Sequence, residues 1–116
     1  MSEEQAKRKL AAILSADAKD YSRLMEDDEE ATVRTITAYR ELMVSQIQNQ
    51  NGRVVDAKGD NLLAEFSSVV DAVRWAVEIQ RELGSRNKEL PEHRKMEFRI
   101  GVNLGDVIEE GETIYG

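Results

Sequence analysis

The sequence predicts an α+β domain in which a mainly antiparallel sheet carries helices on one face. Two observations indicate this fold. In two long segments the apolar residues recur every three or four positions, as in amphipathic helices, and in shorter segments they alternate or run continuously, as in strands. A length of 116 residues with 41% hydrophobic residues suits one domain with a buried core. We therefore expect residues 1–116 to form a single domain.

The first half of the sequence predicts a strand, a helix and a hairpin. Residues 10–16 are almost continuously apolar, which indicates a strand buried on both faces. The acidic residues 26–30 favour the start of a helix. Apolar residues at helical spacing then predict its buried face: Val33, Ile36, Tyr39, Met43 and Ile47. Two strand-like runs flank residues 58–61, which predicts a β-hairpin with Asp60 at its tip.

The second half predicts a further helix and strand. Ser67 or Ser68 can cap the helix, and its expected buried face comprises Val69, Val70, Val73, Ala76, Val77, Ile79 and Leu83. Strict alternation from Met96 to Leu104 predicts a central, half-buried strand. Gly105 and Asp106 predict a turn before a weaker strand or hairpin over residues 107–115. This order of elements is that of a ferredoxin-like or polymerase-palm βαββαβ sandwich.

Charge and composition exclude several classes of function. Sixteen basic and 23 acidic residues give a net charge of −7, which disfavours binding to nucleic acid. The absence of cysteine excludes a disulfide framework, a thiolate metal site and a cysteine nucleophile. The sequence also shows no membrane span and no apolar segment behind its first charged residues. We expect a cytoplasmic protein without a nucleic-acid partner.

Two aspartates are candidates for metal binding. Asp17 follows the first strand and Asp60 lies in the hairpin turn, and in a βαββ arrangement the first strand runs beside the hairpin. Both carboxylates are therefore expected at one end of the sheet. Mg²⁺ is commonly held by one or two carboxylates, with substrate phosphates filling the remaining positions. An aspartate in a turn is, however, more often a turn former than a ligand, so spacing alone leaves both interpretations open.

Three separate segments resemble the class III adenylate/guanylate cyclase catalytic domain, in the order in which that family has them. They are ILSADAKDYSRL at residues 13–24, GDNLLAEF at 59–66 and FRIGVNLGDV at 98–107. The resemblance extends from Lys9 to Gly116 and is nearest to the bacterial adenylate cyclase-like branch. It implies conversion of ATP or GTP into a 3′,5′-cyclic monophosphate with release of pyrophosphate.

The resemblance also implies two Mg²⁺ or Mn²⁺ ions per site, held by the carboxylates of Asp17 and Asp60 and the backbone carbonyl of Ala18. It implies a homodimer whose sites form between the subunits. The segment that approaches the triphosphate in the family matches Asp20, Tyr21 and Ser22.

The purine-binding positions of the family match this sequence only in part. The family has a lysine four residues before the second metal aspartate, and Asp56 stands there in this sequence. An acidic side chain cannot donate to a purine acceptor as a lysine does. Thr113 matches the usual partner of that lysine, and the resemblance implies that Asp56 and Thr113 face the nucleotide across the dimer.

The family continues after Tyr115 and Gly116 with a helix that supplies an Asn and an Arg to the reaction. We therefore expect this chain to be the amino-terminal part of a cyclase domain and to be inactive by itself. The alternative is a pseudo-cyclase that binds nucleotide or dimerises in signalling without turnover. A palm-like nucleotidyl transferase of another kind is compatible with the fold but unsupported by the motifs.

Overall fold

The computed structural model describes residues 7–109, and within them the side chains of residues 10–105. Its four strands form one antiparallel sheet in the order β2-β3-β1-β4. The strands are β1 (Lys7–Ala18), β2 (Gly52–Lys58), β3 (Asn61–Phe66) and β4 (Phe98–Glu109). The helices are α1 (Tyr21–Asp27), α2 (Glu29–Asn49), α3 (Val69–Asn87) and the single 3₁₀ turn η2 (Glu92–Arg94).

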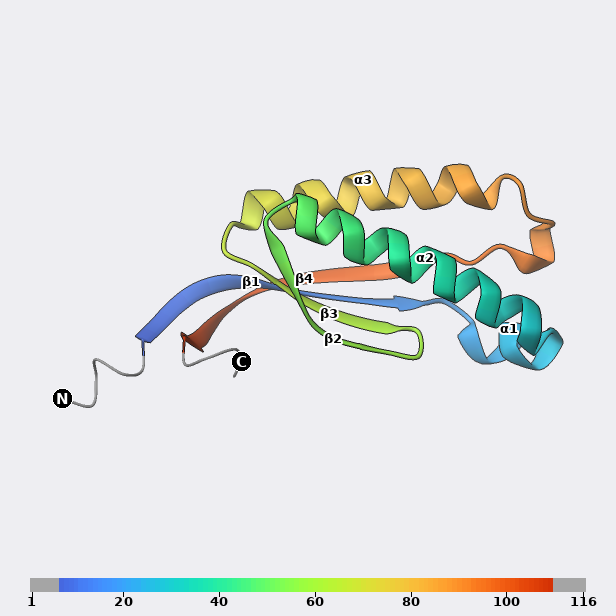
Figure 1. The fold of residues 1–116 in the computed structure, drawn as a ribbon, viewed down its shortest axis with the longest axis horizontal. Coiled ribbons are helices and arrows are strands. Elements are labelled where there is room, and N and C mark those ends of the chain that lie inside the picture. Colours follow the sequence, from blue (N-terminus) through green and yellow to red (C-terminus); the bar gives the residue numbers. More distant parts are fainter. Residues whose placement is uncertain (1–6, 110–116) are drawn as a thin grey trace.

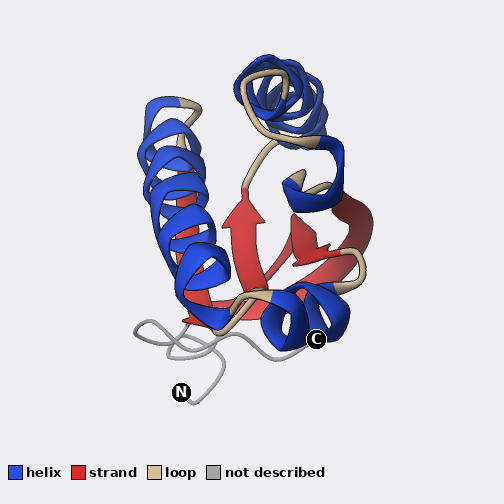
Figure 2. Cartoon of the chain, turned by 90° about the vertical axis from the view of Figure 1, so that its right-hand side faces the viewer, coloured by secondary structure: helices blue, strands red, loops and turns tan. Residues whose placement is uncertain are grey.

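The two long helices lie side by side along one face of the sheet (Figure 1). Figure 2 shows the same layers from the right-hand end of that view, with α2 and α3 as separate rods beside the strands. This confirms the predicted α+β, ferredoxin-like arrangement. None of the described helices is long and apolar enough to cross a membrane.

Strand β1 is buried mainly on the face that meets the helices. The buried residues of that face are Ala12, Leu14, Ala16 and Ala18. On the opposite face, from residue 13 onward, Ser15 is exposed while Ile13 and Asp17 are only partly buried. The expectation of burial on both faces was therefore wrong, because the described helices cover one face of the sheet only.

Helix α2 begins where the acidic residues predict it. Asp28 caps it by accepting a hydrogen bond from the Ala31 amide at 3.0 Å, and Glu29 and Glu30 occupy its first turn, where carboxylates are favoured by the helix dipole. The predicted buried face is confirmed except at Val33, which is 44% exposed. The short helix α1 was not predicted, since only one of its residues, Leu24, is buried and no apolar periodicity marks it.

Helix α3 starts after Ser68, whose hydroxyl accepts from the Asp71 amide at 3.3 Å. Its predicted buried face is confirmed at Ile79 and Leu83 and in part at Ala76, and is wrong at its four valines. The apolar residues that reach the core are Ala72, Trp75, Ile79 and Leu83, whereas Val69, Val70, Val73 and Val77 are 40–62% exposed. Two apolar stripes run along this helix, and the stripe that contains Trp75 is the one that packs into the core.

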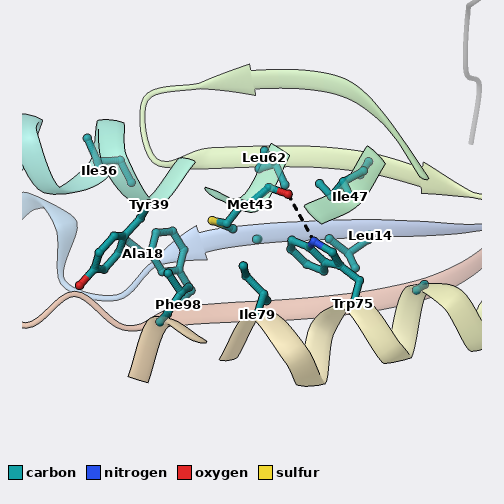
Figure 3. Close-up of a cluster of buried hydrophobic side chains, with 14 of the residues drawn as sticks. Leu14, Ala18, Ile36, Tyr39, Met43, Ile47, Leu62, Trp75, Ile79 and Phe98 are labelled. Carbon is teal, nitrogen blue, oxygen red and sulfur yellow. Dashed lines mark hydrogen bonds between the residues drawn. The ribbon is translucent and has the colours of Figure 1, made fainter. Parts of the chain in front are cut away.

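Trp75 lies at the centre of the core, between the helices and the sheet (Figure 3). Its indole N–H donates to the carbonyl oxygen of Met43 on α2 at 3.3 Å, and its ring packs against Phe66 of β3 with centroids 6.3 Å apart. An indole is buried at low cost when its N–H has a partner. Trp75 thus joins α3, α2 and the sheet.

Strand β4 departs from the prediction in two ways. It runs without a turn through Gly105 and Asp106, and its ladder with β1 extends to the pair Lys7 and Glu109. It also lies at the edge of the described sheet and not at its centre. Ile100 is partly buried, but Leu104 is 58% exposed. The twelve-residue pairing with β1 keeps Gly105 in an extended conformation. The part of the predicted last strand or hairpin that falls on residues 110–115 lies outside the described residues.

Two glycines allow a matched test of this packing. A Cβ at Gly52 would come within 2.8 Å of both the Phe66 ring and Ile47, whereas a Cβ at Gly84 in α3 would meet nothing within 4 Å. We expect Gly52→Ala to lower the free energy of unfolding by about 1–3 kcal/mol through overpacking. Gly84→Ala is expected to raise it by roughly 0.5–1 kcal/mol. Urea denaturation measures both, and an unaffected Gly52→Ala variant would contradict the packing described at the start of β2.

Candidate functional site

The end of β1 brings Asp17 opposite Arg99 of β4. The two residues are partners in the antiparallel ladder, so their side chains lie on the same face of the sheet, away from the helices. Arg99 donates from Nε to Asp17 Oδ1 at 3.0 Å and from its terminal NH2 to Oδ2 at 3.2 Å. This two-pronged geometry is the one that a guanidinium forms with a planar anion.

Further acidic groups lie within electrostatic range of Arg99. The hydrogen bond that Arg99 donates to Asp17, and the negative charge of Asp17, raise the pKa of the Arg99 guanidinium above its ordinary value, and the charges of Asp20 and Asp60 add to the rise. The pair remains accessible, since the side chains of Arg99 and Asp17 are 65% and 36% exposed. Arg99 was not predicted as a site residue, because only the register of β4 on β1 places it beside Asp17.

The hairpin turn brings Asp60 to the same end of the sheet. Gly59 adopts a left-handed conformation with φ of 60°, which glycine tolerates without strain. The β1–β3 ladder ends at Ala16 and Leu62. Two residues further, Asp60 Oδ2 accepts a hydrogen bond from the Ala18 amide at 3.1 Å. The predicted meeting of the hairpin tip with the end of β1 is therefore what the structure shows.

The backbone of Ala18 faces this hairpin tip. In an extended strand the N–H and C=O of one residue point to the same side, so the Ala18 carbonyl points toward Asp60 as its amide does. Ala18 itself is almost fully buried, which fixes the position of its backbone. Two carboxylates and one backbone carbonyl thus gather where β1 ends.

The next residues form the turn from β1 into α1. The Lys19 amide donates to the Glu97 carbonyl at 2.8 Å, which ties this turn to the segment before β4. Asp20 adopts the left-handed conformation, with φ of 54°, and makes no side-chain cap bond. Tyr21 packs against the core and Ser22 is exposed. The three residues of the triphosphate motif therefore lie next to the carboxylates along the chain.

A β-bulge places Asp56 on the open face of the sheet. Val54 pairs with Ala64, but Asp56 pairs with Leu63, so the register between β2 and β3 shifts by one at Val55. Without the shift, Asp56 would point toward the helices, because side chains alternate along a strand. With the shift it faces the same side as Ser15, which is the partner of Leu63 on β1.

The open face contains a hollow of about 550 Å³ that crosses all four strands. Its lining residues are Ser15, Ala16, Asp17, Asp56, Asn61, Leu62, Leu63, Arg99, Ile100 and Gly101. The structure therefore places Asp56, Asp17 and Arg99 around one space within a single chain. Thr113, the other purine-binding candidate, lies outside the described residues.

The donor set fits a hard cation that is shared with a substrate. Among the described residues, no group of three or more His, Asp or Glu side chains is arranged to hold a metal by itself. Mg²⁺ does not require such a cage, since one or two carboxylates with phosphate oxygens are its common environment. The arrangement of Asp17, Asp60 and the Ala18 carbonyl matches that environment.

Comparison with known proteins agrees with the motifs. No protein-family model matches the chain. The protein named "Putative adenylate cyclase 3" from Rhizobium meliloti (strain 1021) is 43% identical over 117 residues, which span 100% of this chain and 20% of that protein. Among solved structures, the adenylate/guanylate cyclase/hydrolase from Silicibacter pomeroyi is 39% identical with a TM-score of 0.84, over 96% of this chain and 65% of that one.

The guanylyl cyclase Cya2 is 25% identical with a TM-score of 0.77, over 97% of this chain and 64% of that one. This chain thus spans about a fifth of its curated relative and just under two thirds of the two solved domains. Over nearly its whole length the chain is similar to class III adenylate/guanylate cyclase domains.

The contact between Asp60 and Ala18 can be tested without any ligand. We expect Asp60→Ala to speed hydrogen exchange of the Ala18 amide, because the amide loses its carboxylate acceptor. Asp60→Asn keeps an oxygen acceptor and is expected to preserve most of the protection. NMR-detected exchange measures this difference, and equal protection in Asp60→Ala and the parent chain would show that the hairpin tip does not reach β1.

Proposed function

We propose that this chain supplies the metal- and triphosphate-binding part of a purine nucleotide cyclase. The reaction forms 3′,5′-cyclic AMP or cyclic GMP and pyrophosphate from ATP or GTP. One observation carries the proposal: Asp60 contacts the Ala18 amide at the end of the sheet where Asp17 pairs with Arg99, and Asp17 and Arg99 line one hollow there. The similarity of the chain to cyclase domains supports the same reaction.

The cofactors of the proposed site are two Mg²⁺ or Mn²⁺ ions. Asp17, Asp60 and the Ala18 carbonyl would hold them, since all three offer the oxygen ligands that these cations prefer. Bound there, the ions would neutralise the polyphosphate and promote in-line displacement at the α-phosphorus. The protein's own contribution is to hold the ligands rigidly: Ala18 is fixed in the core, and Asp60 is fixed to Ala18.

Arg99 has a role toward the triphosphate in this proposal. It lies on an accessible surface and already forms a two-pronged contact with a planar anion, Asp17. A phosphate group presents the same geometry to a guanidinium. We therefore assign Arg99 to the polyphosphate, with Asp17 as its partner when no nucleotide is bound.

Asp56 affects how the site would recognise the purine base, and it supports a second candidate function. Its carboxylate can accept hydrogen bonds from N–H groups of a purine but cannot donate to a ring nitrogen. It also brings negative charge to a hollow proposed to bind a polyanion. This favours, as the second candidate, a pseudo-cyclase that binds nucleotide or dimerises without turnover.

The proposed functional state is a homodimer. The hollow lies on the sheet face that the described helices leave open, and a second copy would close it and exclude water from the triphosphate. Asp56 lines the hollow of its own chain, and in the dimer it would, with Thr113, also face the nucleotide held by the partner subunit, as the family resemblance implies. Because ATP and GTP are cytoplasmic metabolites, the activity belongs in the cytoplasm.

Charge-removing substitutions test the metal ligands. We expect Asp17→Asn and Asp60→Asn each to weaken Mn²⁺ binding in the presence of nucleotide by at least about tenfold, while the unfolding midpoint changes little. Glu30→Gln is the matched control, because the Glu30 side chain is 92% exposed at the start of α2. Calorimetric titration gives the affinities, and wild-type affinity in both aspartate variants would remove the metal assignment.

Substitution of Arg99 separates a binding role from a structural one. Arg99→Gln is expected to leave the urea midpoint unchanged, since the ion pair is exposed. Affinity for a nucleoside triphosphate should fall about tenfold, and affinity for the corresponding monophosphate should fall much less. An equal loss for both nucleotides would place Arg99 away from the β- and γ-phosphates.

A turnover assay decides between the two candidate functions. This chain and a longer version that continues through the family's Asn- and Arg-bearing helix are incubated with ATP or GTP and Mn²⁺, and cyclic nucleotide formation is followed beside nucleotide binding. Turnover by the longer version supports the cyclase, and binding without turnover by both versions supports the pseudo-cyclase. Absence of binding contradicts both.

A further inference from the structure

Helix α2 makes one direct contact with the hairpin turn that carries Asp60. Arg40, near the middle of α2, donates from its guanidinium to the backbone carbonyl of Gly59 at 2.8 Å. Gly59 is the left-handed residue of that turn and precedes Asp60 directly. The side chain of Arg40 therefore binds the backbone of Gly59, the residue before Asp60, which is a proposed metal ligand.

The turn has few other restraints. A Cβ placed at Gly59 would meet nothing within 4 Å, so no side chain packs over it. Lys58 and Asn61 are paired as the last rung of the β2–β3 ladder, and the turn between them lies beside the end of β1 (Figure 1). On the opposite side of the turn, Asp60 is held by the Ala18 amide. In the described part of the chain, Arg40 thus holds one side of the turn at Gly59 and the Ala18 amide holds the other side at Asp60.

We propose that Arg40 is a positioning residue, which holds the Gly59 carbonyl so that the Asp60 carboxylate stays beside Ala18 in a metal-binding orientation. The inference rests on the proposed function for its metal readout. Residues that orient metal ligands commonly affect metal affinity without touching the ion. A guanidinium on a long helix is suited to this task, because α2 is anchored in the core along its whole length by Ile36, Tyr39, Met43 and Ile47.

The proposal predicts two effects of Arg40→Ala in the 116-residue chain. Hydrogen exchange of the Ala18 amide should become faster, because Asp60 is no longer held against it. Mn²⁺ affinity in the presence of nucleotide should fall about tenfold, at the lower end of the range for residues that orient a ligand. Arg40→Lys should restore much of both values, because a lysine ammonium can also donate to the Gly59 carbonyl.

Controls separate positioning from stability. Arg34→Ala removes an arginine of the same helix whose side chain is 70% exposed and pairs with Glu30 one turn away; both readouts should stay at their wild-type values. Arg40→Met keeps the aliphatic stem and carries the test if Arg40→Ala lowers the unfolding midpoint.

Two results would overturn the proposal: unchanged Ala18 exchange in Arg40→Ala, or faster exchange with unchanged Mn²⁺ affinity. If the wild-type chain binds no Mn²⁺, the proposed function fails, and the positioning of Asp60 by Arg40 is decided by Ala18 exchange alone.

Discussion

The structure depends on the pairing of β1 along both of its edges. β3 pairs with residues 12–16, and β4 pairs with the whole strand from Lys7 to Ala18. Because opposed residues in a ladder share a face, these two registers decide which side chains meet the helices and which meet the open hollow. A slip of one residue would turn Asp17 into the core and expose the buried alanines of β1. The same strand register thus places the core residues on one face of the sheet and the site residues on the other.

Buried polar contacts fix the other elements against this sheet. The Tyr39 hydroxyl donates to Asn87 Oδ1 at 2.7 Å, and Asn87 exchanges two hydrogen bonds with the backbone of Met96 at 2.9 and 3.1 Å. Burial raises the pKa of Tyr39 above its ordinary value, in the direction that favours the protonated phenol as donor. This network joins α2, α3 and the segment before β4. Its polar groups can be buried because each of them has a hydrogen-bond partner.

Arginines connect the helices to the loops around the site. Arg94, at the end of η2, donates to Thr32 Oγ1 at 2.6 Å and lies 3.5 Å from both the Leu24 carbonyl and Asp27. It thereby fixes the junction of α1 and α2, and α1 follows directly from the loop after Asp17. Arg40 does the equivalent for the hairpin turn. The segments that carry Asp17 and Asp60 are therefore restrained by separate contacts. Such restraint suits a binding site that must keep its geometry.

The sequence by itself determined the order of the strands and the two long helices, the acidic start of α2, the hairpin turn at Gly59 and the two aspartates, because each depends on local chemistry or on short motifs. Tertiary structure decided the rest. Which stripe of α3 is buried depended on where Trp75 fits, since both stripes are apolar. The course of β4 through Gly105 depended on its partner β1. The bulge at Val55 and the pairing of Arg99 with Asp17 depended on how separate strands align with one another. A local sequence pattern does not predict that alignment.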